Sequence, residues 1–159
     1  MLVVAANWGI GDGSLRDAPP ARVTAFVDDL RRSAVLGGWQ ETGRYETVGA
    51  IDLVLAGDTL DWYASRHWTG TARPWRRDAD SRRVGETVVR ATLLRARRVL
   101  APLIRLTREG LALPGADRRG RPTFDAPVVV PVRVTLLEGN LDAGLGGTLG
   151  RLVASALEL

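Results

Sequence analysis

Apolar residues along this chain fall into runs of two different spacings. Short continuous apolar runs at 2–6 and 51–56 stop at Asn7 and at Gly57-Asp58, which is typical of buried strands that feed loops. Between them, the apolar residues of 20–36 recur at helical spacing, with Pro19-Pro20 before the pattern and Gly37-Gly38 after it. The order strand, helix, strand predicts a parallel βαβ unit.

The rest of the chain continues this alternation. Apolar residues spaced among arginines predict a long helix over 83–108, bent at Pro102. Residues 128–137 are expected to form an entry segment and a third strand, and 145–159 one more helix. Residues 62–80 and 113–124 show no clear period and are predicted to be loops.

Length and composition fit one folded unit. With 159 residues, 45% of them hydrophobic and 25% charged, the chain matches an ordinary globular protein, and it contains no internal repeat. We expect a single α/β domain over 1–159, with a mostly parallel sheet and flanking helices. No run of eighteen apolar residues and no signal peptide is evident, so the expected location is the cytoplasm, away from membranes.

The residue inventory limits the possible chemistry. Cysteine is absent and His67 is the one histidine, which excludes thiolate sites and a multi-histidine zinc site within one chain. The net charge is +4 and every basic side chain is arginine, which indicates codon bias more than a binding surface. An arginine-rich nucleic-acid binder is kept as an alternative, although nucleic acid is not the expected partner.

Polar residues follow each of the three predicted strands. Ligands of open parallel sheets bind outside the carboxyl ends of the strands, where these three loops would converge. Carboxylate and amide oxygens are the ligands that hard divalent cations prefer. The candidate ligands are Asn7 and Asp12 after the first strand, Asp58 and Asp61 after the second, and Asn140 and Asp142 after the third.

The same loops resemble motifs of the calcineurin-like metallophosphoesterases. That family carries Asp-x-His, Gly-Asp-x-x-Asp and Gly-Asn-His-Asp or Glu after three successive strands. The second motif is intact here at 57–61, whereas 139–142 has Leu141 in place of histidine. At the first motif Asn7 replaces the aspartate and Gly9 the histidine, followed by Gly11-Asp12-Gly13-Ser14. The resemblance extends over the amino-terminal half of the family's layered sandwich.

The resemblance implies a fold, a reaction and a ligand set. The family uses two metal ions to polarise a phosphoester and activate water, with Asp58 as the expected bridging ligand and Asn140 as a ligand of the second metal. Asn7 would be a weak ligand, and Asp61, Asp12 and Asp142 are possible additions. The cation expected on oxygen ligands is Mn²⁺ or Mg²⁺. No catalytic residue is assigned, because leucine stands where the family has its proton-donating histidine.

The resemblance also implies weak or absent activity on a small phosphoester. Three motif positions depart from the family, and the family's carboxyl-terminal half, with its Gly-His-x-His, has no counterpart in this chain. Half of a sandwich leaves an apolar sheet face, which predicts self-association or a partner chain that covers it. A non-catalytic binding module that keeps the fold is therefore the main alternative function.

Simpler interpretations stand beside these. Asp58 and Asp61 would also serve as caps of the turn that follows a strand. The glycines at 9, 11 and 13 match a dinucleotide-binding loop poorly. Glu138, with the pair Asp58 and Asp61, could supply acid and base carboxylates for a glycoside, but nothing in their spacing demands it. The aromatic residues around His67 are expected to pack the 62–80 loop more than to stack on bases.

Overall fold

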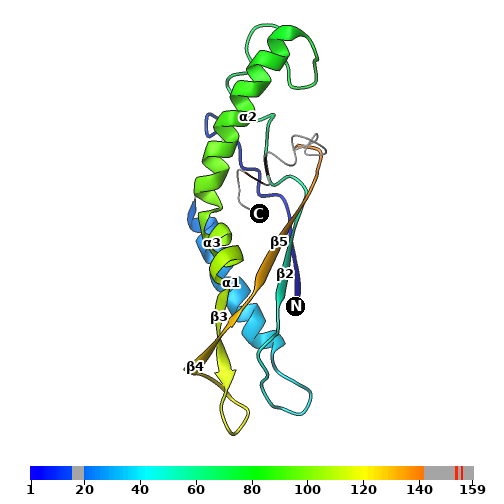
Figure 1. Cartoon of the computed structure of the whole chain (residues 1–159). Helices are drawn as coiled ribbons and strands as arrows, with labels where there is room; N and C mark the ends of the chain where they lie inside the picture. The colour runs from blue at the N-terminus through cyan, green and yellow to red at the C-terminus, as the bar shows by residue number, and fades with distance from the viewer. Residues whose placement is uncertain (16–19, 142–152, 154, 156–159) are drawn as a thin grey trace.

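The computed structural model describes residues 1–15, 20–141, 153 and 155. The molecule is elongated, with the helices along one side of a small parallel sheet and a β-hairpin at one end (Figure 1). The strands and helices, in chain order, are β1 (Leu2–Ala5), α1 (Pro20–Gly37), β2 (Ile51–Ala56), α2 (Ala79–Val99), α3 (Ala101–Glu109), β3 (Leu111–Ala116), β4 (Pro122–Val130) and β5 (Val132–Leu137).

The predicted parallel βαβ unit is present. β2 lies at the centre of a three-stranded sheet of order β1-β2-β5, and both neighbours run parallel to it. In register, Leu53 lies between Val3 and Val134. All three strands therefore end at the same edge, and this mixed α/β architecture with a parallel sheet confirms the expected fold class at that level.

Alternation along β2 places the core on one face of the sheet. Ile51, Leu53 and Leu55 are fully buried, whereas the residues between them are only partly covered. They pack in one cluster with residues of α1 and α3 such as Leu30 and Leu103. In Figure 1, the helices lie on one side of the strands, so this face is the covered one.

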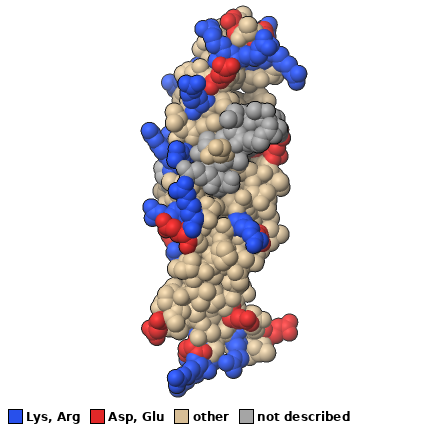
Figure 2. Space-filling model, in the orientation of Figure 1, with Lys and Arg blue, Asp and Glu red and all other residues tan. Residues whose placement is uncertain are grey.

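The other face of the sheet is largely open. Leu2 is 67% exposed and Val4 is 61% exposed, although both lie in a parallel strand. Side chains of parallel sheets are normally covered on both faces. An ion pair between Asp52 and Arg133 (3.4 Å) marks one end of the open face. Figure 2 shows the charged side chains mainly at the two ends and along one side of the molecule, with a wide uncharged region between.

The long helix predicted over 83–108 is present as two helices. α2 begins after Asp78, whose side chain accepts the backbone N–H of Ser81, and it ends at Val99, with Leu100 between it and α3. Pro102 lies in the first turn of α3, where a missing N–H costs nothing. The sequence therefore predicted the break correctly, two residues from its actual position.

The prediction of a loop over 113–124 was wrong. Residues 111–116 and 122–130 form the antiparallel hairpin β3-β4, with Leu111 and Leu113 buried. Asp117 closes the turn by accepting the N–H groups of Arg119 and Arg121. The prolines and glycines of this stretch indicated a loop, but burial of the two leucines against the helices favours the strand.

The predicted third strand is divided between two sheets. Pro131 separates β4, which pairs with β3, from β5, which pairs with β2. Residues 62–78 form an irregular loop, as expected. Of the helix predicted over 145–159, the described residues Val153 and Ser155 are helical, Val153 is buried, and the remainder lies outside the described residues. No helix in the described part of the chain is long and apolar enough to cross a membrane.

Candidate functional site

The loops after β1 and β2 join at the carboxyl edge of the sheet. Gly9 donates its backbone N–H to the carbonyl of Asp58 (2.8 Å), and Ile10 donates to Thr59 (3.0 Å). Asp61 in turn donates its backbone N–H to the carbonyl of Ile10 (3.0 Å). The parallel pairing of the strands thus continues past their ends, which brings the first two candidate motifs into contact.

The loop after β5 closes on the same point through Asp58. Leu141 donates its backbone N–H to Asp58 Oδ1 (2.8 Å). With the amide oriented so that its nitrogen faces the carboxylate, Asn140 donates to Oδ1 and Oδ2 at 3.3 and 3.1 Å. Two of the three predicted main ligands, Asp58 and Asn140, are therefore direct neighbours.

Two glycines allow this close approach. A Cβ on Gly139 would lie 2.4 Å from both the backbone nitrogen and Oδ1 of Asp58, a distance that no real Cβ contact shows. Gly57 has a φ of 72°, and a Cβ there would lie 3.2 Å from the Cα of Gly139. The glycine of each motif is thus needed for the contact between the two motifs.

Asn7 and Asp58 share an unusual backbone conformation. Among the described residues, they are the two non-glycine residues with positive φ, at 58° and 49°. Asn and Asp adopt this left-handed conformation more readily than other side chains, but it still carries a cost. Strain of this kind is common at functional sites, and here it coincides with two of the three main predicted ligands.

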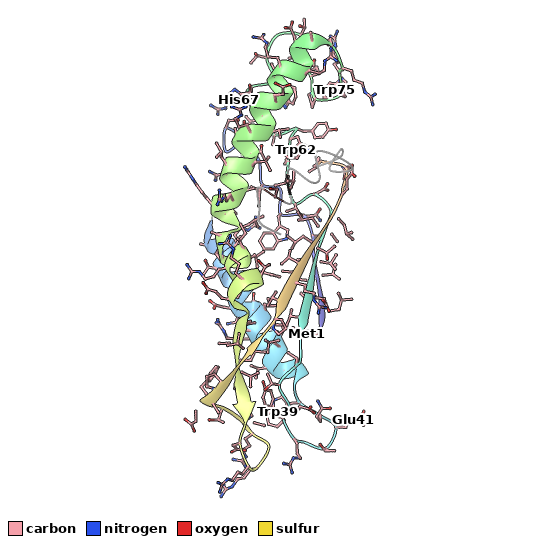
Figure 3. All side chains as sticks on the ribbon, viewed as in Figure 1. Met1, Trp39, Glu41, Trp62, His67 and Trp75 are labelled. Carbon is pink, nitrogen blue, oxygen red and sulfur yellow. The ribbon has the colours of Figure 1, made fainter. Side chains whose placement is uncertain are left out.

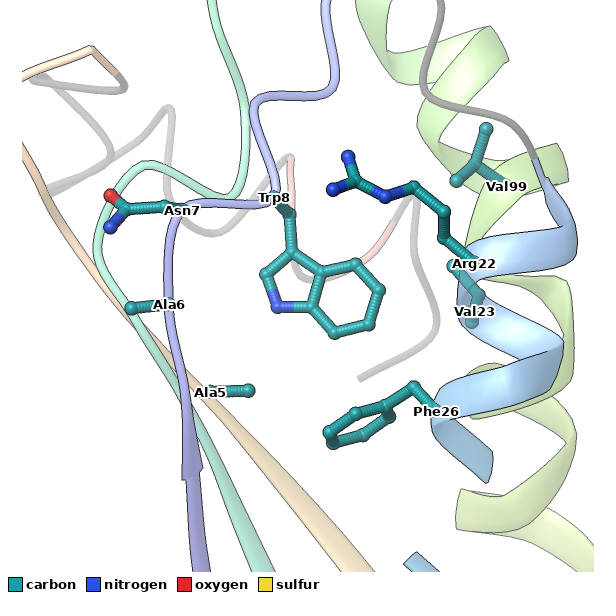
Figure 4. Close-up of a pocket in the computed structure, with 8 residues that line it drawn as sticks. All are labelled: Ala5, Ala6, Asn7, Trp8, Arg22, Val23, Phe26 and Val99. Atoms are coloured by element: carbon teal, nitrogen blue, oxygen red, sulfur yellow. The ribbon is translucent and has the colours of Figure 1, made fainter. Parts of the chain in front are cut away.

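Asn7 reaches this edge from β1. Its backbone N–H points to the carbonyl of Gly57 (3.4 Å), and its side chain is exposed. In Figure 4 the Asn7 amide lies on the opposite side of the chain from the Trp8 ring.

Asp12 is placed in a separate hydrogen-bonded cluster. Its side chain is 1% exposed and accepts bonds from the N–H and hydroxyl of Ser14 and from the hydroxyl of Ser65. His67 Nε2 lies 3.8 Å away. Burial by itself raises the pKa of Asp12, but the hydrogen bonds from Ser14 and Ser65, aided by His67, outweigh it and hold the pKa below its ordinary value of 3.8.

The hydroxyl groups of Ser14 and Ser65 each accept a hydrogen bond in addition to the one that they donate to Asp12. The Ser14 hydroxyl accepts the N–H of Arg66 (2.8 Å), and the Ser65 hydroxyl accepts that of His67 (3.1 Å). Two of these bonds, from Ser65 to Asp12 and from Arg66 to Ser14, link the loop after β1 to the loop that begins the 62–78 segment. We call Asp12, Ser14 and Ser65 the loop latch, since its polar atoms are used to hold the two loops together.

Asp61 caps its own turn. Its Oδ1 accepts the backbone N–H groups of Tyr63 and Ala64, both at 3.0 Å, and the residue is buried. This is the structural role that the simpler interpretation of the motif gave to an aspartate here. Asp142 lies outside the described residues.

The aromatic residues of the 62–78 loop divide between packing and exposure. Trp62 is buried, and Trp68 donates its indole N–H to the carbonyl of Trp62 (2.8 Å). Trp75 is exposed, and Figure 3 places it beside the far end of α2, away from Trp62. The predicted packing role is therefore observed for Trp62 and Trp68 and not for Trp75.

The strand-end residues fit a two-metal centre poorly. Such a centre needs a bridging carboxylate and several further ligands on each metal. Asp58 is the carboxylate at the junction, its neighbours are amides, and Asn140 turns its nitrogen toward it. In the described part of the chain, no group of three or more His, Cys, Asp or Glu side chains is placed to hold a metal ion.

A cavity next to this edge was not foreseen. It occupies about 330 Å³ between the end of β1 and helices α1 and α2 (Figure 4). Trp8 and Phe26 form its aromatic walls, with their ring centroids 5.2 Å apart in an edge-to-face arrangement. The sequence signal was available in the tryptophan that directly follows Asn7, but nothing in the sequence pairs it with a residue of α1.

Comparisons of the chain with protein-family models, with curated proteins and with solved structures find no match. What the site does is therefore inferred from its own residues.

Proposed function

We propose that this protein is a degenerate relative of the calcineurin-like metallophosphoesterases, with phosphoester hydrolysis weak or absent. The observation that supports this most is the contact of Gly57-Asp58 with Gly139-Asn140 at the ends of adjacent parallel strands. On this proposal the sheet and its helices correspond to half of the layered sandwich of that family.

The hydrogen bonds at this contact support the part of the proposal that says hydrolysis is weak or absent. The Asp58 carboxylate accepts N–H groups from Leu141 and Asn140, so part of its lone-pair capacity serves the loops. Leu141 also occupies the position where the family has a proton-donating histidine. Because Asn140 turns its amide nitrogen toward Asp58, we expect this carboxylate, with water, to hold at most one Mn²⁺ or Mg²⁺ ion, and weakly.

Hydrolysis of an aryl phosphodiester with excess Mn²⁺ tests this function. Wild type is compared with Asp58→Ala and with Asp125→Ala, an exposed aspartate of β4. We expect all three proteins to hydrolyse the substrate at the same background rate. Activity that Asp58→Ala removes and Asp125→Ala retains would show a working metal centre and contradict the proposal.

We infer a second function, as an interaction module, from the open face of the sheet. The exposed Leu2, Val4 and Leu137 lie there beside one acidic and one basic residue, Asp52 and Arg133. A two-fold interface needs a self-complementary patch. On this face, Asp52 of one copy could pair with Arg133 of a second copy, and Arg133 with the second copy's Asp52. The partner proposed here is therefore another copy of this chain.

Sedimentation equilibrium tests the second function. Wild type is expected to form a dimer, and Val4→Arg is expected to weaken its association at least tenfold. Leu36→Arg is the matched control, because Leu36 is a similarly exposed apolar residue on α1. A wild-type monomer across the accessible concentrations, or equal effects of the two substitutions, would contradict this function.

A further inference from the structure

The cavity beside β1 is a separate feature from the strand-end residues. Eight described residues line it, and most of its wall is apolar: Ala5, Ala6, Asn7, Trp8, Arg22, Val23, Phe26 and Val99. Its volume of about 330 Å³ lies near the lower end of the range for small-molecule sites, which begins at roughly 300 Å³. It therefore has room for a ligand built on one ring.

One positive charge lines this apolar space. Arg22 and Phe26 are four residues apart on α1, so both side chains lie on the same helix face, and Figure 4 shows both beside Trp8. No hydrogen bond or ion pair joins the Arg22 guanidinium to another of the described residues, in contrast to Arg31, which pairs with Asp28 at 3.1 Å. Arg22 is thus available to an anion.

The indole N–H of Trp8 is a second polar group at this wall, and no described residue accepts it. The indole nitrogen is shielded from solvent. A buried donor of this kind is normally satisfied, and an exception calls for an explanation. In Figure 4 this nitrogen lies on the side of the indole that faces Ala5 and Ala6, away from Arg22, so the contact expected between Trp8 and a ligand is with the ring.

We propose that this cavity binds a small aromatic anion, with its ring against Trp8, Phe26 and Val23 and its anionic group at Arg22. A guanidinium binds the oxygens of a carboxylate and of a phosphate with the same type of hydrogen bond. The ligand is therefore defined as an oxyanion, of either type, on a flat apolar ring. This site is independent of phosphoester hydrolysis. Neither a metal ion nor Asp58 takes part in it.

Isothermal titration of the full chain with phenyl phosphate, benzoate and neutral benzyl alcohol tests this site. We expect at least one of the two anions to bind, with benzyl alcohol at least tenfold weaker than the better one. The preferred anion distinguishes a phosphate ligand from a carboxylate ligand. Equal binding of the alcohol and both anions, or no binding of any of the three, would overturn the proposal.

Two arginine variants locate the binding. Arg22→Gln is expected to weaken the better anion at least tenfold and to leave benzyl alcohol unchanged. Arg31→Gln is the matched control, since nine residues along α1 place it about half a turn round from Arg22, and it is expected to bind like wild type. Equal losses in the two variants would overturn the assignment to this cavity, and circular dichroism verifies that both are folded.

Discussion

Asp12 and Asp58 lie in neighbouring loops at the same edge of the sheet, yet their surroundings differ. The side chain of Asp12 is 1% exposed and accepts three hydrogen bonds within the loop latch. Asp58 is half-buried, has a φ of 49° and faces a backbone N–H and an amide. The difference separates a carboxylate that is enclosed by its hydrogen-bond donors from one that stays partly exposed.

Removal of the Asp12 carboxylate should lower the free energy of unfolding more than any other substitution proposed here. Asp12→Ala leaves the hydroxyls of Ser14 and Ser65 without their acceptor, and we expect a loss of about 3 kcal/mol in the free energy of unfolding. Urea unfolding at pH 7 measures it. Asp125→Ala, an exposed control, should change the free energy by no more than about 0.5 kcal/mol, and equal effects of the two substitutions would remove the loop latch from the account.

A side chain added at the contact between Gly139 and Asp58 should cause the next largest loss of stability. Gly139→Ala places a methyl group 2.4 Å from backbone and carboxylate atoms of Asp58, and we expect a loss of about 2 kcal/mol from the forced shift of the loop. Gly49→Ala is the control, since a Cβ there meets nothing within 4 Å. Thermal unfolding of both variants decides the matter, and a neutral Gly139→Ala would mean that the two loops are not packed as described.

The lowered pKa of Asp12 predicts a pH dependence with a definite sign. Because the folded pKa lies below the unfolded value, this carboxylate contributes its full stability above about pH 5 and loses it as the pH falls through the folded pKa. Over this acidic window, stability should fall by up to about 1.4 kcal/mol per pH unit for this one proton. Asp12→Asn should flatten the acid side of the stability curve, and an unchanged slope would contradict the lowered pKa.

The smallest effect on stability is expected at Asp58. Asp58→Asn keeps an oxygen for the N–H of Leu141, so unfolding in urea should change by less than about 1 kcal/mol. A loss as large as that of Asp12→Ala would show that both carboxylates are structural to the same degree, and the comparison between them would fail.

The sequence was informative wherever one strong local pattern coincided with burial. The apolar runs of β1 and β2 and the period of α1 predicted those elements, and the strand-end rule placed Asp58 beside Asn140. The β3-β4 hairpin was missed because Pro114, Gly115 and Gly120 signal a loop, while Leu113 is buried in a strand that packs on α1, a helix distant in the sequence.

The sequence was less informative about which carboxylate does what. Asp12 and Asp61 follow strands just as Asp58 does, but local N–H and hydroxyl donors hold both in their own turns. The cavity at Trp8 needed the contact between β1 and α1, which no residue spacing encodes.

Our proposal is that the Asp58–Asn140 contact between two loops supports no two-metal centre. Electron paramagnetic resonance of free Mn²⁺, titrated into wild type and Asp58→Ala, tests it most directly. We expect no more than one weakly bound ion per wild-type chain, and none in the variant. Two tightly bound ions per chain that depend on Asp58 would contradict it.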